Sequence, residues 1–331
     1  MKALVVGLGS AGRRHAENLV ALGVEEVIGC SEWRQLKELN LAGRPTEVIH
    51  DYSQALDRNP DAVFIANPTS LHMSYLEAAV ERGFHVYVEK PLAASCAGLS
   101  HIVEKVRHSP SIIAVGCQLR FNECLRRLKA QLLDSRIGRL LHVHVDMGEY
   151  LPNYHPDEDY RTGYAARRDL GGGVLATQIH DVNYLHWLLG LFQQVYAIGG
   201  KISQLEVNVE DSVSFLMKGE SCPTTVHIDY LQQSSRRVLV VTGELGTLTW
   251  NYHLNSLKLI DTQGETELGP GGPLVRNEMF IAAVSDFLHC IRTHERPRTD
   301  FWEGLMDLAV VDAIRDSFTS NKMVPICYDV A

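Results

Sequence analysis

The chain of 331 residues lacks several features that would define other classes of protein. It has no apolar run near the roughly 18–20 residues of a membrane-spanning helix, and we expect no membrane partner. Basic residues are not in excess: 31 Lys and Arg stand against 40 Asp and Glu, which argues against a nucleic-acid partner. The seven cysteines form no CxxC pair and no zinc-type spacing, so we expect reduced thiols and no metal site. The first apolar run breaks at glycine, unlike a signal peptide, and we expect a cytoplasmic protein.

What the sequence does contain is an apolar run that leads directly into a glycine-rich turn. Residues 3–12 read ALVVGLGSAG, which fits GxGxxG between a short strand and a helical stretch. The first glycine permits a tight turn, the second lets the backbone approach a pyrophosphate, and the third allows close packing of helix on strand. The helix N-terminus offers N–H groups to phosphates. The motif predicts dinucleotide binding by Gly7, Gly9, Ser10, Ala11 and Gly12.

The first third of the chain alternates between strand and helix patterns. We expect strands at 24–30, 46–50, 61–66, 84–88 and 112–117. A charged helical stretch should lie between the strands at 24–30 and 46–50, and helices are expected at 71–82 and 95–108. Such alternation predicts a doubly wound parallel sheet, which we assign to an NAD(P)-binding Rossmann domain at 1–120.

The pattern changes after residue 120. A helix at 123–133 precedes seven segments that alternate apolar and polar residues, at 140–149, 194–202, 211–218, 224–230, 236–242, 247–252 and 257–261. We expect further helices at 176–189, 279–293 and 302–321. This predicts an α+β domain at 121–331 with an open, mainly antiparallel sheet. A sheet face left uncovered by helices would favour a homodimer or homotetramer.

Two loops at the expected carboxyl ends of parallel strands carry polar side chains. In a doubly wound sheet these loops line the ligand crevice. Lys90 follows the strand at 84–88, where its ammonium could orient a substrate hydroxyl; a solvated surface lysine is the alternative. The cofactor-binding residues predicted from the two loops are Asn67, Pro68, Thr69, His72, Glu89 and Lys90.

A third segment runs from the glycines at 171–173 into a helix that contains His180. Imidazole titrates near neutral pH, so His180 is a candidate general base at a carbinol. A histidine satisfied within the core is the alternative.

Taken in order, GLGSAGRRH, ANPTSLH, EKPLA and the glycine run before His180 resemble the glucose–fructose oxidoreductase/inositol 2-dehydrogenase (Gfo/Idh/MocA) family over nearly the whole chain. The resemblance implies a Rossmann domain, an open sheet domain, and NAD(P)-dependent oxidation or reduction of a sugar, sugar nucleotide or cyclitol. Lys90 takes the position of the family's substrate-contacting lysine and His180 that of its catalytic histidine. It also implies a cis Lys90–Pro91 bond.

The chain departs from the family pattern near the histidine. Ala176 stands where many members carry Asp, and Asn183 where a second acid often follows. Candidates for a replacement lie in the polar loop at 150–168: Asp157, Glu158, Asp159, Tyr160 and Tyr164. That loop resembles the subset of the family found in surface-polysaccharide and nonulosonic sugar pathways; a solvated loop is the alternative. The predicted substrate-contacting residues are Lys90, Tyr160, Arg161, Tyr164, Thr177 and His180.

The end of the second strand bears on the choice of cofactor. Ser31 at the tip, with Arg34 one turn on and Arg13 opposite, favours NADP slightly. A shift of one residue would put Glu32 at the tip, where a carboxylate holds the ribose 2′-OH of NAD. Two rival functions stay open: a cofactor-bound sensor without turnover, and an NAD-dependent glycoside-cleaving enzyme.

Overall fold

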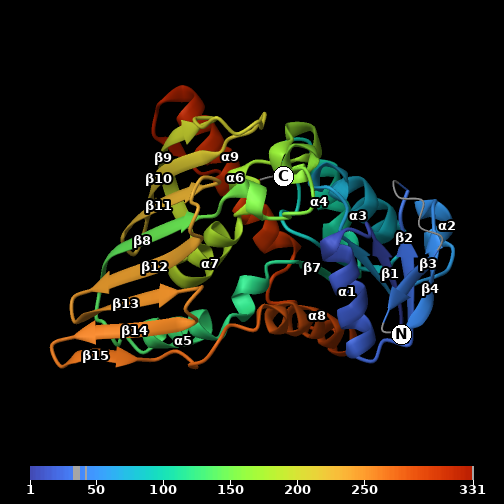
Figure 1. The fold of residues 1–331 in the computed structure, drawn as a ribbon, viewed down its shortest axis with the longest axis horizontal. Helices are drawn as coiled ribbons and strands as arrows, with labels where there is room; N and C mark the ends of the chain where they lie inside the picture. Colours follow the sequence, from blue (N-terminus) through green and yellow to red (C-terminus); the bar gives the residue numbers. More distant parts are fainter. Residues whose placement is uncertain (33–37, 42, 330–331) are drawn as a thin grey trace. The chain divides into compact units, whose positions relative to one another are not determined.

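The computed structural model describes residues 1–32, 38–41 and 43–329, which form two compact units (Figure 1). The first unit contains the described residues of 1–118 together with 277–305. The second contains residues 119–276 and 306–329. The last helix therefore begins in the first unit and ends in the second.

The first unit is built on a seven-stranded sheet in the order β3-β4-β2-β1-β5-β6-β7. All neighbouring strands are parallel except β3 and β4, and β1 lies in register with both neighbours, Leu4 opposite Ile28 and Val63. This confirms the predicted doubly wound sheet. The strands are β1 (Lys2–Val6), β2 (Glu26–Cys30), β3 (Glu38–Leu41), β4 (Arg44–Ile49), β5 (Ala62–Ile65), β6 (His85–Val88) and β7 (Ile113–Val115).

Two local predictions in this unit are wrong. The helical stretch expected between β2 and β4 includes β3, which pairs antiparallel with β4 because Leu39 and Leu41 alternate into the core. Residues 33–37 of that stretch lie outside the described residues. The helix expected from 95 begins only at Ser100, since Gly98 has a φ of +78° that no right-handed helix accepts. The helices are α1 (Ser10–Ala21), α2 (Tyr52–Leu56), α3 (His72–Glu81), α4 (Ser100–His108) and α8 (Arg276–Thr293), with the 3₁₀ turns η1 (Thr69–Leu71) and η2 (Gln118–Phe121).

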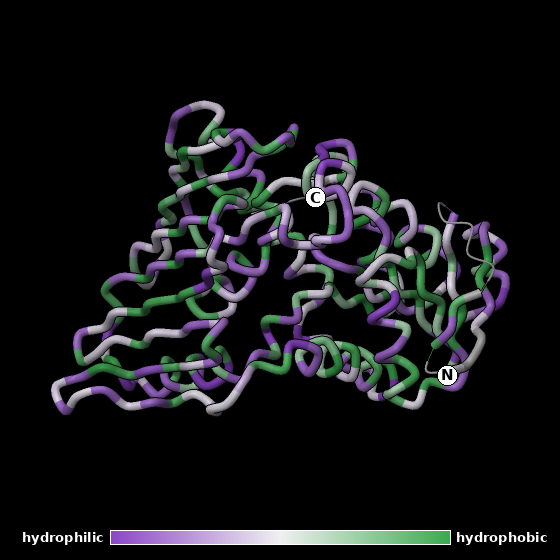
Figure 2. Tube along the Cα trace, viewed as in Figure 1, coloured by the Kyte–Doolittle hydropathy of each residue, from purple (hydrophilic) through white to green (hydrophobic). Residues whose placement is uncertain are grey.

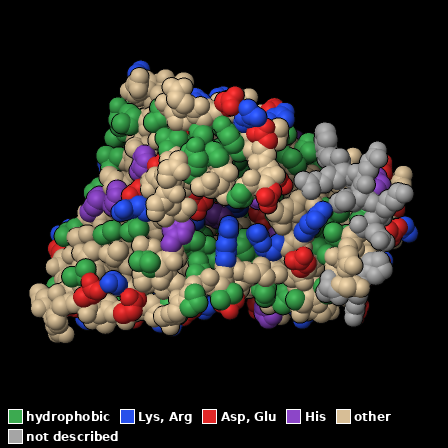
Figure 3. Space-filling model, viewed as in Figure 1, with side chains coloured by type: hydrophobic (Ala, Val, Ile, Leu, Met, Phe, Trp, Pro, Cys, Tyr) green, Lys and Arg blue, Asp and Glu red, His purple; other side chains and the backbone are tan. Residues whose placement is uncertain are grey.

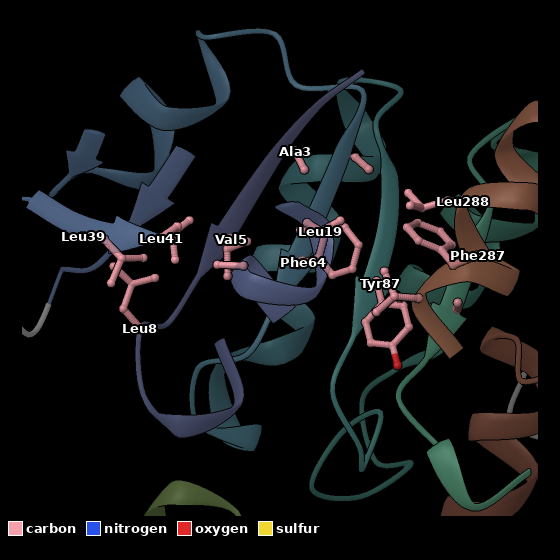
Figure 4. Close-up of a cluster of buried hydrophobic side chains, with 14 of the residues drawn as sticks. Ala3, Val5, Leu8, Leu19, Leu39, Leu41, Phe64, Tyr87, Phe287 and Leu288 are labelled. Carbon is pink, nitrogen blue, oxygen red and sulfur yellow. The ribbon is translucent and has the colours of Figure 1, made fainter. Parts of the chain in front are cut away.

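The core of the first unit is completed by a helix from late in the chain. Hydrophobic residues concentrate along the strands of this unit in Figure 2, and Figure 4 shows side chains of these strands beside Phe287 and Leu288 of α8. The Phe287 ring lies 5.6 Å from the rings of both Phe64 and Tyr87, and its side chain is fully buried. The sequence pattern assigns this helix to the domain after residue 120. In the structure it packs on the seven-stranded sheet of the first unit.

The second unit is built on a nine-stranded sheet in the order β15-β14-β13-β12-β8-β11-β10-β9-β16. Neighbours are antiparallel except β8 and β11, which run parallel. This confirms the open, mainly antiparallel sheet, and the short edge strands β15 and β16 are additional to the expected ones. The strands are β8 (Leu140–Gly148), β9 (Phe192–Gly200), β10 (Ser212–Gly219), β11 (Pro223–Asp229), β12 (Arg236–Gly243), β13 (Gly246–Asn251), β14 (Ser256–Asp261), β15 (Gly264–Glu267) and β16 (Val324–Pro325).

The helix expected at 176–189 is wrong as a single element, because it is two helices broken at Gln178 and Ile179. Gln178 has φ −105° and ψ +24°, which ends α6, and His180 is the first residue of α7. The helices of the second unit are α5 (Glu123–Leu133), α6 (Val174–Thr177), α7 (His180–Leu189) and most of α9 (Phe301–Ser320), with the 3₁₀ turns η3 (Leu151–Asn153), η4 (Tyr160–Thr162), η5 (Tyr164–Ala166) and η6 (Arg168–Leu170).

The two faces of the second sheet differ in exposure. Val143, Val145 and Met147 of β8 are fully buried on one face, on which α5 packs at β13 and β14. The opposite face leaves Ile198 55% and Leu216 40% exposed. Figure 3 shows histidine and hydrophobic side chains over the strands of this unit, at the left of the view. Alternation along each strand therefore produces one core face and one open face.

Candidate active site

The turn between β1 and α1 is closed by close backbone contacts. Gly7 has a φ of +84°, and a Cβ there would lie 2.5 Å from the amide nitrogen of Asn67. A Cβ on Gly12 would lie 1.8 Å from the carbonyl oxygen of Gly7. A Cβ on Gly9, by contrast, meets no described atom within 4 Å. Two glycines are therefore required by the protein itself, and the third leaves open space at the turn.

The start of α1 suits an anion. Gly9 is its N-cap, and among the described residues no side chain caps it. None of the residues in the first turn, all of which are described, is acidic. The first N–H groups of a helix lack partners inside the helix and carry partial positive charge. The open space at Gly9 and this uncompensated helix end fit a dinucleotide pyrophosphate.

The loops after β5 and β6 are joined by a buried histidine. His72 is 1% exposed, with Nδ1 2.9 Å from the carbonyl oxygen of Pro91 and Nε2 3.0 Å from that of Asn67. Burial lowers the pKa of His72, and a neutral imidazole donates to one of these carbonyls at a time. Thr69 is also buried, in η1. His72 and Thr69 therefore hold the loop that carries Asn67 and Pro68, which are both partly exposed.

The EKP segment after β6 contains a buried ion pair. Glu89 is 9% exposed, and its Oε1 lies 2.6 Å from Nε2 of His15 on α1. Burial acts to raise the pKa of Glu89, but the hydrogen bond and charge of His15 outweigh it and lower that pKa. The Lys90 N–H donates to the other carboxylate oxygen at 3.2 Å, and the Lys90–Pro91 bond is cis, as expected. The carboxylate thus joins α1 to the backbone of Lys90, whose side chain is partly exposed.

At the end of β2 the two candidate residues differ in exposure. Ser31 is 5% exposed; its N–H donates to the Ile49 carbonyl, and its own carbonyl lies 2.7 Å from Nδ1 of His50. Glu32 is exposed and accepts hydrogen bonds from the Tyr52 N–H at 3.3 Å and from the Tyr75 hydroxyl. Glu32 is therefore the side chain presented at the strand tip. Arg34 lies outside the described residues.

In the second unit the glycine run approaches the polar loop. A Cβ on Gly172 would lie 2.0 Å from the carbonyl oxygen of Tyr164. Beyond it, the Thr177 hydroxyl lies 2.6 Å from the Tyr230 hydroxyl, and Thr177 and His180 are 3% and 5% exposed. Ala176 is buried as well, so its position contributes a methyl group and no carboxylate.

A buried polar network surrounds the segment that carries His180. Arg237 on β12 is 6% exposed; its guanidinium donates to Oε1 of Gln178 and lies 3.3 Å from Oδ2 of Asp181. The Gln178 amide donates to the Tyr154 hydroxyl at 2.7 Å. The Tyr184 hydroxyl donates to Oδ1 of Asp181 at 2.6 Å. Burial raises the pKa of Asp181, while the charge of Arg237 acts to lower it.

The other residues predicted in the polar loop are engaged at the surface. Arg161 pairs with Asp159 at 2.8 Å and with Glu206 at 3.1 Å, and the hydrogen bonds from Arg161 hold the pKa of Asp159 low. The Tyr160 hydroxyl accepts a hydrogen bond from the Glu206 N–H. Asp157 and Glu158 are exposed. Tyr164 is partly exposed and begins η5, with its carbonyl oxygen facing Gly172.

Sequence reasoning did not identify the partners of the His180 segment, namely Tyr154, Asp181, Tyr230 and Arg237. One signal was available for Arg237. It shares the parity of Leu239 and Val241 in a strand that alternates between faces, so it falls on the buried face. A charged residue on that face requires a buried partner.

Two further searches concern other kinds of site. No group of three or more His, Cys, Asp or Glu residues in the described part of the chain is arranged to hold a metal ion. No helix within residues 1–32, 38–41 and 43–329 is long and apolar enough to cross a membrane.

A parallel sheet with an open glycine turn at its first strand and an uncapped helix start defines a dinucleotide-binding class of protein. Comparison with known proteins specifies which one. The model of the oxidoreductase family with an NAD-binding Rossmann fold matches residues 1–117, and that of the GFO/IDH/MocA C-terminal domain matches residues 125–249. The chain belongs to the GFO/IDH/MocA family of NAD-binding oxidoreductases.

Individual relatives span the whole chain. Inositol 2-dehydrogenase of Pseudomonas syringae pv. syringae is 30% identical, over 98% of this chain and 96% of the relative. Myo-inositol 2-dehydrogenase of Thermotoga maritima is 26% identical over 98% of both chains. The solved structure of a levoglucosan dehydrogenase in complex with NADH has a TM-score of 0.87 and 18% identity, covering 99% of both chains. That structural likeness concerns the fold.

Proposed function

We propose that this enzyme transfers a hydride between NAD and a carbon-bound hydroxyl of a sugar, sugar nucleotide or cyclitol, or the corresponding ketone. The single observation that carries the proposal is the family match across both units, joined to the open glycine turn at Gly9. The inositol 2-dehydrogenases that span the full chain support a cyclitol as the first substrate to test.

Lys90 and His180 are the proposed catalytic residues, acting on the same substrate hydroxyl. When bound, the nicotinamide supplies the hydride acceptor or donor. The Lys90 ammonium donates a hydrogen bond to the hydroxyl oxygen and orients it, while the His180 imidazole takes the hydroxyl proton. The buried Glu89–His15 pair beneath the Lys90 backbone supports this role, since it fixes the start of the lysine's loop.

Further substrate contacts are proposed for polar residues near His180 and in the loop at 150–168. Thr177 lies in α6 and Tyr164 begins η5, while Tyr160 and Arg161 lie on the surface of the loop. For the dinucleotide we propose the start of α1 at the pyrophosphate, with Ser10, Ala11 and the loop of Asn67 and Pro68 alongside.

For the choice of cofactor we propose NAD rather than NADP, which reverses the slight preference that the sequence suggested. Glu32 is the exposed carboxylate at the β2 end, held by Tyr75 and Tyr52, whereas Ser31 is buried. A carboxylate accepts hydrogen bonds from the ribose 2′-OH and repels a 2′-phosphate. Glu32→Ser should therefore lower the ratio of kcat/KM for NAD to that for NADP by about tenfold or more, since tenfold corresponds to about 1.4 kcal/mol.

For assembly and location we propose a cytoplasmic homodimer or homotetramer. Residues 1–120 bind the cofactor, and residues 121–331 provide substrate binding and self-association. The open face of the second sheet, with Tyr196, Ile198 and Leu216 exposed, supports self-association through that sheet. All seven cysteines are described and are free thiols, which supports a reducing compartment. Light scattering at micromolar concentration tests the assembly, and a monomer would contradict it.

The function is tested by nucleotide-fluorescence titration with NADH and NADPH, followed by a screen of cyclitols, sugars and sugar nucleotides for the reduced-nicotinamide absorbance. We expect tighter binding of NADH and net formation of reduced cofactor with at least one polyol. Cofactor binding without turnover on any substrate would favour a sensor. Product formation without net change of cofactor would favour a glycoside-cleaving enzyme.

A further inference from the structure

We propose that Arg237 is a positioning residue for His180, and that its buried network replaces the acidic side chain absent at Ala176. The inference rests on the proposed function, because it takes His180 to be the proton acceptor. It concerns a residue 57 positions away in the chain and on a different element.

The geometry connects one guanidinium to both sides of His180. Arg237 points from β12 toward the helix side of the sheet, where it contacts Gln178, two residues before the histidine, and Asp181, one residue after it. Both contacts are made by one nitrogen, Nη2, which donates to Gln178 and lies at ion-pair distance from Asp181. Because the guanidinium is buried, it keeps these two side chains close to one another. The two-residue break between α6 and α7 is therefore clamped at both ends.

The clamp adds side-chain contacts to a segment that backbone hydrogen bonds hold on both sides of the break, from the Gln178 N–H to the Val174 carbonyl at 2.9 Å and from the Asn183 N–H to the Ile179 carbonyl at 3.0 Å. His180 is the first residue of α7, and the N-cap, Ile179, has no side-chain cap among the described residues. The Asp181 N–H bonds the Gln178 carbonyl at 3.1 Å, a single turn across the break. The first residue of a helix is fixed less firmly than its interior. Side-chain contacts from β12 thus supply the rigidity that a functional histidine requires.

The network continues from Gln178 into the polar loop. The Gln178 amide uses its oxygen for Arg237 and its nitrogen for the Tyr154 hydroxyl, so both ends of the amide are occupied. Asp181 likewise uses one oxygen for Tyr184 and the other faces Arg237. Burial acts to lower the pKa of Arg237, but the charges of Asp181 and Glu149 act to raise it, and the Tyr252 ring lies 5.7 Å from the guanidinium carbon. The guanidinium is therefore charged and surrounded by acceptors and acids.

The neighbouring residue provides a matched control. Arg236 lies on the same strand with the opposite parity, and its guanidinium pairs with Asp146 at 2.6 Å on the exposed face. Arg236→Lys and Arg237→Lys both keep a positive charge and remove the guanidinium, whose Nη2 makes both contacts of Arg237. Only the second change breaks the clamp around His180.

The test is an NMR titration of the His180 imidazole in the full-length protein, with the resonance assigned by its loss in His180→Asn. We expect Arg237→Lys to move the titration midpoint and to lower kcat by on the order of 10- to 100-fold, the loss typical of a misplaced catalytic group, with KM for NAD unchanged. Arg236→Lys should leave all three at wild-type values. A His180 titration in Arg237→Lys that superimposes on wild type would overturn the proposal.

A second variant guards against misfolding. Gln178→Met keeps the size of the side chain and removes both hydrogen bonds of the amide, and we expect the same direction of change in the titration and in kcat. Unchanged values in Gln178→Met would equally overturn the proposal. If the wild type transfers no hydride to any substrate while Arg237→Lys still moves the His180 titration, the proposed function fails and the positioning of His180 by Arg237 stands.

Discussion

The two units differ in what forms their candidate sites: backbone groups in the first and side chains in the second. In the first, the glycine turn is made of backbone: positions 7 and 12 exclude any Cβ, and the start of α1 supplies N–H groups. In the second, the surroundings of His180 are made of side chains from β12, α6, α7 and the loop after η3. A site formed by backbone groups is determined by residues adjacent in the sequence. A site formed by side chains depends on contacts between elements that are far apart in the chain.

The largest effect we expect is on kcat, when the proposed catalytic residue of either unit, Lys90 or His180, is removed. Lys90→Ala and His180→Ala should each lower kcat by about 10²–10⁴-fold, the usual contribution of a positioned proton-transfer group. If both act on one hydroxyl, the double variant should be little worse than the poorer single variant, because residues that act as a unit are not additive. The measurement is steady-state kinetics at saturating cofactor. Losses that multiply would contradict a shared hydroxyl.

A smaller effect concerns the buried pair in the first unit. Glu89→Gln removes the buried carboxylate that is hydrogen-bonded to His15, and losing a buried hydrogen bond to a charged group costs up to about 3 kcal/mol of the free energy of unfolding. The pKa of Glu89 is lowered in the folded state, so its contribution is present above the unfolded value of about 4.3 and is lost as the pH falls through the folded value. Urea unfolding should therefore show a gap between wild type and variant that narrows in acid. A constant gap would contradict the pairing.

Two single substitutions separate the structural role of the glycine turn from its proposed role in cofactor binding. Gly12→Ala puts a Cβ against the Gly7 carbonyl and should cost about 3 kcal/mol of folding free energy or more. Gly9→Ala enters open space and should cost about 1 kcal/mol or less, because alanine is a poorer N-cap than glycine. It should nevertheless weaken NADH binding about tenfold or more, a loss of about 1.4 kcal/mol. Thermal unfolding and fluorescence titration separate the two. Unchanged NADH affinity in Gly9→Ala would contradict the assignment.

The smallest effect lies on the open face of the second sheet. His227 bonds Asp229 at 2.8 Å and Ser214 at 2.7 Å, and the hydrogen bond that the imidazole donates to the Asp229 carboxylate raises the pKa of His227. Its side chain is 35% exposed, so His227→Asn should cost less than about 1 kcal/mol. The stabilisation is fully present below the unfolded value of about 6.5 and is lost as the pH rises through the raised folded value. Unfolding near pH 6 and near pH 9 at fixed assembly state should show a gap only at the lower pH.

The contrast between the units also explains which predictions from sequence were correct. The parallel sheet, the glycine turn and the cis Lys90–Pro91 bond follow from local motifs and the family they resemble, and the structure contains all three. The strand β3 was missed because it is only four residues long, Glu-Leu-Asn-Leu, and follows the charged stretch at 32–37. The break at Gln178 was missed because the side chain that holds Gln178 comes from β12.

The same reasoning applies to the residues around His180. The absence of an acid at Ala176 was evident in the sequence, and the replacement was sought in the nearby loop at 150–168. The structure instead provides Asp181 and Arg237, one adjacent in sequence and one distant. From the sequence, the position of Arg237 on the buried face of its strand indicates a buried charge that needs a partner. The sequence does not indicate which residue that partner is.

The central claim is that a hydride passes directly from a substrate carbon to the bound nicotinamide. The most direct test uses the polyol identified by the substrate screen, deuterated at the carbon that bears the reacting hydroxyl, with mass spectrometry of the cofactor. The account predicts one deuterium in each reduced cofactor formed by the wild-type enzyme. Reduced cofactor without the label, or label released into water, would contradict it.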